Sequence, residues 1–288
     1  MIHSRGDRRS NFALTEYALT LAGPRDRPRL CYVPTAVGDS QAAIDAKQAT
    51  FREQRPDVEF SVLRLFTQPS VPDVRTHLLT RDVILVEGDS VVNLMAVWRA
   101  HALPAIMRDC WEAGVVLSGG SAGSLCWHVG GPTDSYRDAL DPFVDGLALP
   151  PFSNGVHDDF TDQPRRAVYR SMVAAGELPA GYASEDGVGL HYVGTELNEA
   201  VSIRQGATAW WVERDGSASY MQRPIDTALL QSRARLCALG RCGCRRKIAA
   251  PVEPLTLPHS VANGRSPTGS RVAAASSTGR LWSWWTSS

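Results

Sequence analysis

The sequence predicts an α/β protein with a mostly parallel sheet that is covered by helices on both faces. Three observations support this fold class. Strand-like and helix-like segments alternate along residues 29–129. The segment Val83–Val86 (VILV) is apolar throughout, as strands are when both faces of a parallel sheet are buried. The chain has 288 residues, 43% of them hydrophobic, which is enough for one large core.

The individual elements follow from local patterns. Short apolar or alternating runs bounded by turn residues predict four strands, Arg29–Pro34, Val58–Phe66, Val83–Val86 and Val115–Leu117. Apolar spacing of three to four residues predicts five helices, Ser40–Gln54, Val74–Thr80, Ser90–His101, Pro104–Glu112 and Ala122–Val129. Past residue 180, the extended segments Gly187–Val193 and Ala207–Val212 predict that the sheet continues with antiparallel strands. Ligands of such sheets bind beyond the carboxyl ends of the strands. These ends are Thr35–Asp39, Glu87–Asp89 and Gly119–Gly123.

Charge and hydropathy restrict the partners and the location. The formal net charge is zero, and no apolar run is long enough to span a bilayer. The N-terminal stretch MIHSRGDRRSNF is not followed by the apolar segment of a secretory signal. We therefore expect a cytoplasmic protein with no membrane partner.

The last part of the chain differs in composition from the rest. Residues 226–288 carry nine basic and two acidic side chains and are rich in Pro, Gly, Ser, Thr and Ala. We expect a catalytic domain over residues 1–225 and a basic, low-order extension over residues 226–288. Nucleic acid as a partner of this extension is the less favoured interpretation. Its three cysteines and a later histidine lack the usual zinc spacing, so no metal site is expected; they are Cys237, Cys242, Cys244 and His259.

One motif indicates nucleophilic chemistry. The segment Gly119–Gly123 (GGSAG) matches G-x-S-x-G and lies between a predicted strand and a predicted helix. In this context the serine of a nucleophile elbow takes a strained conformation that tolerates only small neighbours. Ser121 would then be the nucleophile, and the N–H of Ala122 would face a developing oxyanion. A glycine-rich turn that only allows close packing, or an anion-binding loop, is the alternative.

The segment GGSAGSLCWHVGGPTDS, followed by LPPFSNGVH and YASEDGVGL, resembles the peptidase E family of serine peptidases, which are aspartyl dipeptidases related to cyanophycinase. The resemblance covers Phe12 to about Arg214. It implies a flavodoxin-like sheet related to class I glutamine amidotransferases. It also implies hydrolysis of short peptides with N-terminal Asp, without a metal or another cofactor.

The resemblance also assigns roles to individual residues. Ser121 matches the nucleophile, and His157 in SNGVH matches the histidine that takes and returns its proton. Asp186 in SEDGVG is the first choice for the acid that orients the imidazole, and Asp134 in GPTDS is the second. Glu185 precedes Asp186 in a strand-like run, so its side chain should point to the opposite face. Solvated surface carboxylates, and a solvated loop histidine, are the alternatives.

Substrate recognition by this family requires a cation for the aspartyl side chain. Arg165 and Arg166 in TDQPRRAVYR lie where the family carries an arginine segment, and a guanidinium can bind a carboxylate through two hydrogen bonds. The alternative is the exposed face of a surface helix.

Two departures from the family pattern stand out. The family has a glycine-rich turn after the VILV strand, whereas this chain has Glu87-Gly88-Asp89. Gly88 remains as an oxyanion donor, but two carboxylates beside it would oppose a developing negative charge. The chain also lacks the short strand that usually precedes the NFALTEYAL segment, so a strand of the sheet is expected to be missing.

The function expected from these observations is that of a metal-independent serine dipeptidase. The alternative is a catalytically impaired relative that binds a peptide or a small acidic ligand. A cyanophycin-degrading or isoaspartyl enzyme, and the choice between monomer and homodimer, remain open.

Overall fold

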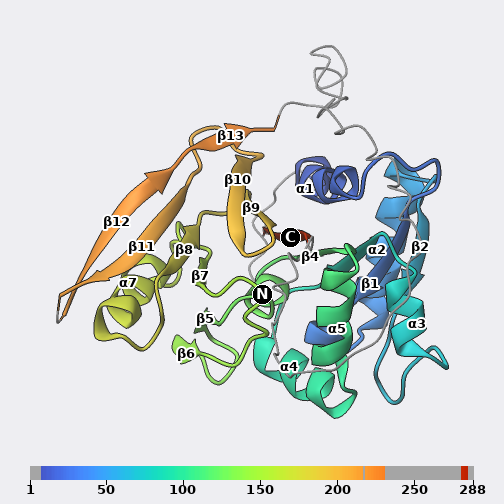
Figure 1. Cartoon of the computed structure of the whole chain (residues 1–288), viewed down its shortest axis with the longest axis horizontal. Helices are drawn as coiled ribbons and strands as arrows, with labels where there is room; N and C mark the ends of the chain where they lie inside the picture. The colour runs from blue at the N-terminus through green and yellow to red at the C-terminus, as the bar shows by residue number, and fades with distance from the viewer. Residues whose placement is uncertain (1–7, 217, 231–279, 285–288) are drawn as a thin grey trace, which may run out of the picture. The chain divides into compact units, whose positions relative to one another are not determined.

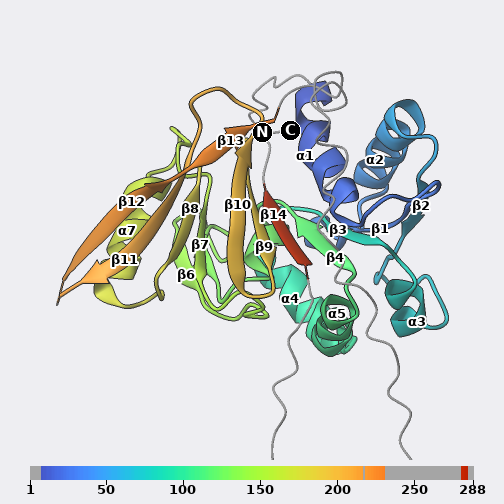
Figure 2. The ribbon, with the colours of Figure 1, turned by 45° about the horizontal axis from the view of Figure 1, so that its top comes forward.

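The computed structural model, which describes residues 8–216, 218–230 and 280–284, has an eight-stranded sheet at its centre (Figures 1 and 2). In order across the sheet, its strands are β13 (Thr227–Leu229), β10 (Glu196–Ser202), β9 (Val188–Val193), β14 (Arg280–Trp284), β4 (Val116–Gly119), β3 (Val83–Val86), β1 (Arg29–Val33) and β2 (Glu59–Val62). The neighbours β2, β1, β3 and β4 are parallel. The predicted fold class is therefore confirmed.

Alternating side chains of the parallel strands enter two separate cores. In β1, Cys31 and Val33 join one hydrophobic cluster, whereas Leu30 and Tyr32 join the other. The strand β3 divides its side chains in the same way. Because both faces are buried, every position of β3 is apolar, which explains the VILV run.

Helices cover each face of this sheet. The helices α1 (Arg8–Leu21) and α2 (Gln41–Gln54) lie on one side of the sheet (Figure 2). They bury Leu14 and Phe51 against Leu30 and Tyr32. The other face is covered by α3 (Val74–Leu79), α4 (Val91–Ala100) and α5 (Leu103–Glu112), preceded in the chain by the short 3-10 helix η1 (Thr35–Val37). None of the helices within the described residues has the length and apolar character needed to cross a bilayer.

The strand β14 occupies an interior position of the sheet although it comes from the end of the chain. It pairs in parallel with β4 and antiparallel with β9, and Leu281 is fully buried between them. The predicted domain boundary at residue 226 does not divide this sheet. Both β13 and β14 lie after residue 226, and they pair with strands that come before it. The cysteines of the extension and His259 lie outside the described residues.

A second, four-stranded sheet adjoins the first. Its strands, in order, are β12 (Ser219–Ile225), β11 (Ala209–Asp215), β8 (Gly181–Ser184) and β7 (Ser153–Val156). The helix α7 (Arg165–Ala175) packs on β11 and β12. The predicted strand Ala207–Val212 therefore belongs here and not to the main sheet. The strands β5 (Gly131–Thr133) and β6 (Asp141–Phe143) form a separate two-stranded sheet.

The helix α6 (Ala122–Leu125) is shorter than the predicted Ala122–Val129. The carbonyl groups that would continue it accept other partners. Leu147 and Leu149 donate their backbone N–H groups to the carbonyls of Cys126 and Trp127 at 2.8 Å each. A neighbouring loop thus satisfies these groups, and the helix ends after one turn.

Candidate active site

Ser121 occupies the tight corner between β4 and α6. Its φ angle is 52°, in a region that residues with a side chain rarely adopt. A Cβ atom at Gly119 would lie 2.2 Å from the Gly123 carbonyl oxygen, and one at Gly123 would lie 2.4 Å from the Val86 carbonyl oxygen. The backbone is therefore packed too closely for larger residues on either side of the serine. This explains the small residues of the GGSAG motif.

Ser121, His157 and Asp186 form a chain of hydrogen bonds. His157 Nε2 lies 3.0 Å from Ser121 Oγ, and His157 Nδ1 lies 2.9 Å from Asp186 Oδ1. With its proton on Nδ1, the imidazole donates to Asp186 and accepts from the serine hydroxyl. His157 follows β7 and Asp186 follows β8, and these strands are parallel neighbours. Their carboxyl ends therefore bring the two side chains together.

The imidazole of His157 is buried, with 8% of its side chain exposed. Burial lowers its pKa below the usual 6.5, and the nearby cation Arg165 lowers it further. The hydrogen bond and the charge of Asp186, and the charge of Asp134, act in the opposite direction without cancelling this effect. The pKa of His157 therefore stays low, and the ring is neutral near neutral pH, as a general base must be.

Asp134 does not contact the imidazole. Its Oδ2 atom accepts hydrogen bonds from Arg165 Nη2 at 3.0 Å and from Gln163 Nε2 at 3.1 Å. Of the two acids that the sequence suggests, the geometry joins Asp186 to His157 and leaves Asp134 as a nearby charge.

The two predicted substrate arginines have different surroundings. Arg165 is buried against Asp134, and its charge acts on both His157 and Asp186. Arg166 instead forms ion pairs with Asp158 at 3.0 Å and with Glu185 at 2.8 Å. The structure therefore places Arg165 close to the serine site, whereas the charge of Arg166 is paired with acidic side chains of the protein itself.

Glu185 points away from the imidazole, as expected, but for a different reason. It lies in the turn after β8, and its carboxylate accepts hydrogen bonds from Arg166 and from the Thr208 N–H at 3.1 Å. The turn, rather than the alternation of a strand, separates its side chain from that of Asp186.

Gly88 lies against the serine, since a Cβ at this position would be 3.0 Å from Ser121 Cβ. The neighbouring Glu87 binds Tyr32 Oη at 2.5 Å and Lys47 Nζ at 3.1 Å. Burial would raise the pKa of this carboxyl, but Lys47 and Tyr32 hold it below its usual value. The charge of Glu87 is thus compensated by Lys47. However, the Gly88 N–H, an expected oxyanion donor, donates to Glu87 Oε1 at 3.3 Å.

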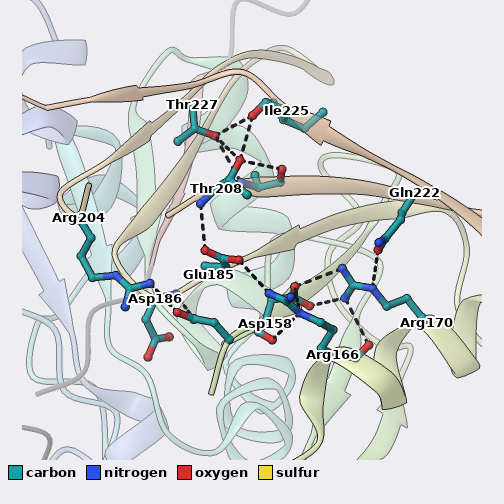
Figure 3. A network of polar contacts seen from close by, with 12 residues as sticks. Asp158, Arg166, Arg170, Glu185, Asp186, Arg204, Thr208, Gln222, Ile225 and Thr227 are labelled. Atoms are coloured by element: carbon teal, nitrogen blue, oxygen red, sulfur yellow. Dashed lines mark hydrogen bonds and ion pairs between the residues drawn. The ribbon is translucent and has the colours of Figure 1, made fainter. Parts of the chain in front are cut away.

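A network of acids and arginines surrounds the histidine loop (Figure 3). Asp158 is buried and forms an ion pair with the buried Arg170 on α7. The next residue, Asp159, accepts the Asp186 N–H and pairs with Arg204. Arg166 and Arg170 are four residues apart on one helix, so their side chains lie on the same face. This spacing in the sequence could have indicated that they bind the same acidic residue.

No three His, Cys, Asp or Glu side chains gather as a metal ion would require within the part of the chain that the structure describes.

The fold and this geometry are typical of α/β serine hydrolases, in which a strained serine follows a strand and receives its base from a neighbouring loop. The model of peptidase family S51 matches residues 2–200, and the chain belongs to this family. The Bacillus subtilis (strain 168) protein named "Uncharacterized peptidase YgaJ" is 35% identical over 206 residues, which cover 70% of this chain and 85% of that protein.

A crystal structure of a peptidase from an acI-B1 Actinobacterium is similar in fold, with a TM-score of 0.52 and 16% identity. The match covers 75% of this chain and 89% of that one. At this identity, the likeness concerns the fold alone.

Proposed function

We propose that the protein is a serine dipeptidase that hydrolyses short peptides with N-terminal Asp through an acyl-enzyme on Ser121. The hydrogen-bonded chain from Ser121 through His157 to Asp186 is the observation that carries this proposal. Membership of peptidase family S51 supports the same reaction class.

The two steps of the reaction use the same histidine. Ser121 Oγ attacks the carbonyl carbon of the scissile bond and transfers its proton to His157 Nε2. Asp186 stabilises the imidazolium that forms. His157 then protonates the leaving amine, and the first residue of the peptide remains bound to Ser121 as an ester. A water molecule, deprotonated by His157, attacks this ester, and the proton returns to Ser121.

Two backbone groups are candidates for stabilising the oxyanion. Ala122 begins α6 directly after the serine, and the first N–H groups of a helix have no acceptor within it. Gly88 adjoins Ser121 on the other side. For Gly88 to contribute, its N–H must exchange Glu87 Oε1 for the substrate oxygen.

Arg165 is the cation that we assign to the aspartyl side chain. Its side chain is largely buried and acts on His157 and Asp186, whereas its partner Asp134 has 40% of its side chain exposed. A substrate carboxylate can therefore approach this pair from the exposed side. Two parallel hydrogen bonds to a guanidinium would distinguish Asp from its neutral isostere Asn.

The test compares hydrolysis of Asp-Leu and Asn-Leu by the full chain and by Ser121→Ala. We expect turnover of Asp-Leu, a clear preference over Asn-Leu, and no turnover by the variant. Equal rates for the two peptides would contradict the assigned selectivity. Labelling of Ser121 by a serine-directed acylating reagent, mapped by mass spectrometry, should disappear in His157→Ala.

A second candidate is a catalytically impaired relative that binds a peptide or a small acidic ligand. The contact between the Gly88 N–H and Glu87 favours it, because one oxyanion donor is already engaged. Retained binding of Asp-Leu, measured by calorimetry, together with the absence of turnover would support this candidate.

A further inference from the structure

Three consecutive residues after β7 each bind a different set of partners. His157 contacts Ser121 and Asp186. Asp158 is buried against Arg170, and its own N–H donates to the Ser184 carbonyl at 3.0 Å. Asp159 accepts a hydrogen bond from the backbone N–H of Asp186. The loop of the histidine is therefore connected both to α7 and to the turn after β8.

The turn that carries Asp186 is closed by its neighbours. The Val188 N–H donates to the Glu185 carbonyl at 3.0 Å, and Gly187 takes a positive φ of 82°. Glycine suits this position because a side chain would be strained there. Asp186 sits at the corner, and its N–H points out of the turn and donates to Asp159 Oδ1 at 2.7 Å.

Arg204 binds the other carboxylate oxygen of Asp159. Its Nη2 atom lies 2.5 Å from Asp159 Oδ2. Arg204 follows β10 in the chain, and the adjacent Ile203 N–H donates to the Gly187 carbonyl at 2.9 Å. Figure 3 shows Arg204 and Asp186 on one side of the network and the Asp158–Arg170 pair on the other.

We propose that Asp159, held by Arg204, is a positioning residue that sets the separation of His157 and Asp186. Asp159 lies two residues after the base and binds the backbone of the acid itself. One carboxylate thus connects the loop and the turn that must stay in register for the hydrogen bond at His157 Nδ1. The inference rests on the proposed function, in which that bond orients the base.

This role is separate from a contribution to folding. Arg204 and Asp159 have 49% and 25% of their side chains exposed, and exposed ion pairs add little to stability. Asp158 and Arg170 are 1% and 3% exposed, so that pair belongs to the packed interior. Variants of Asp159 should therefore fold normally, and their effect should be a lower rate of peptide hydrolysis.

The experiment compares Asp159→Ala, Asp159→Asn and the control Asp162→Ala in the full chain. Asp162 is a nearby exposed acid that bonds to Thr161. With Asp-Leu as substrate, and rates divided by the fraction of Ser121 that an acylating reagent labels, we expect kcat of Asp159→Ala to fall about 10- to 100-fold, since small misplacements have effects of this size. KM should change little. Asp159→Asn keeps an acceptor for the Asp186 N–H and should recover part of the rate.

The ionisation of His157 is a second readout that does not depend on turnover. Within the part of the chain that the structure describes, the charges of Asp186, Asp134 and Arg165 act on this ring. A displaced Asp186 no longer supports the imidazolium, so the pKa of His157 in an NMR titration should fall in Asp159→Ala and stay unchanged in Asp162→Ala. An unchanged pKa and an unchanged kcat per labelled site would overturn the positioning role. The expected pKa change without turnover in the parent chain would support this role and reject the peptidase reaction.

Discussion

Ser121 Oγ and His157 Nε2 are 3.0 Å apart, and both residues have positive φ angles, 52° and 60°. Such conformations cost about 1–3 kcal/mol each for residues with a side chain. They persist where the surrounding structure leaves no alternative. Here the close backbone contacts of Gly119 and Gly123 confine the serine, and the bonds of Asp158 confine the histidine. Such strain clusters at functional sites, and its presence at both ends of one hydrogen bond fits the role that we propose for this pair.

The pH dependence of kcat/KM should reflect the low pKa of His157. The buried ring loses its proton below the usual 6.5, so the acidic limb of the profile should have its midpoint below that value. Asp186 raises this pKa, and Asp186→Asn should therefore move the limb further down. The same variant should lower kcat by about 10⁴-fold, because an amide at this position favours the imidazole tautomer whose Nε2 cannot accept the serine proton.

The matched control is Asp138→Asn, which changes an exposed acid elsewhere on the surface. Its profile should equal that of the parent chain. Full activity of Asp186→Asn would remove this acid from the proposed mechanism.

Glu87 should limit the rate by engaging an oxyanion donor. In Glu87→Ala, the Gly88 N–H loses its carboxylate partner and becomes available to the substrate oxygen. We expect kcat to rise by at least tenfold, up to the factor of about 10²–10³ that one such donor contributes. Single-turnover acylation of Ser121 measures this directly. Glu59→Ala, which removes the surface partner of Arg81, should leave the rate unchanged. A lower acylation rate in Glu87→Ala would assign Glu87 a supporting role instead.

Much of the candidate site could be predicted from the sequence because its signals are local. The motif around Ser121 fixes a strand, a corner and a helix within a few residues. His157 and Asp186 came from the resemblance to a known family, because the strands that precede them were not predicted. The structure shows why the two residues meet, since each follows the end of a strand and the two strands are parallel neighbours. The orientation of Glu87 could not be predicted in this way. It depends on Lys47 of α2 and Tyr32 of β1, which approach Glu87 only in the folded sheet.

The place of β14 is the largest feature that the sequence did not indicate. Its residues follow a long stretch of low-order composition, and both partners are distant in the chain. Strand pairing over such separations leaves no local periodicity to read. The composition of residues 226–288 thus led us to predict a domain boundary at residue 226, although two strands after that residue belong to the main sheet.

The ion pair of Asp158 with Arg170 should matter more for stability than for chemistry. Removal of Arg170 takes the buried partner from Asp158 and leaves Arg166 as its remaining ion-pair partner. Breaking a buried pair typically costs up to about 3–5 kcal/mol. Arg170→Ala should lower the free energy of unfolding by this amount in urea denaturation. Arg204→Ala removes a partly exposed partner of the same network and should change it by about 1 kcal/mol or less. Equal losses in the two variants would contradict the division of roles within the network.

Leu281 should be a core residue of the main sheet despite its place near the end of the chain. It is fully buried where β14 pairs with β4 and β9. Leu281→Ala would leave a cavity and should lower the free energy of unfolding by about 2–5 kcal/mol. Leu229→Ala is the matched control, since Leu229 lies on β13 of the same sheet with 49% of its surface exposed. It should cost about 0.5 kcal/mol or less. If both variants unfold at the same urea concentration as the parent chain, β14 is not an interior strand in solution. If only Leu281→Ala is destabilised, the end of the chain completes the sheet that holds Ser121.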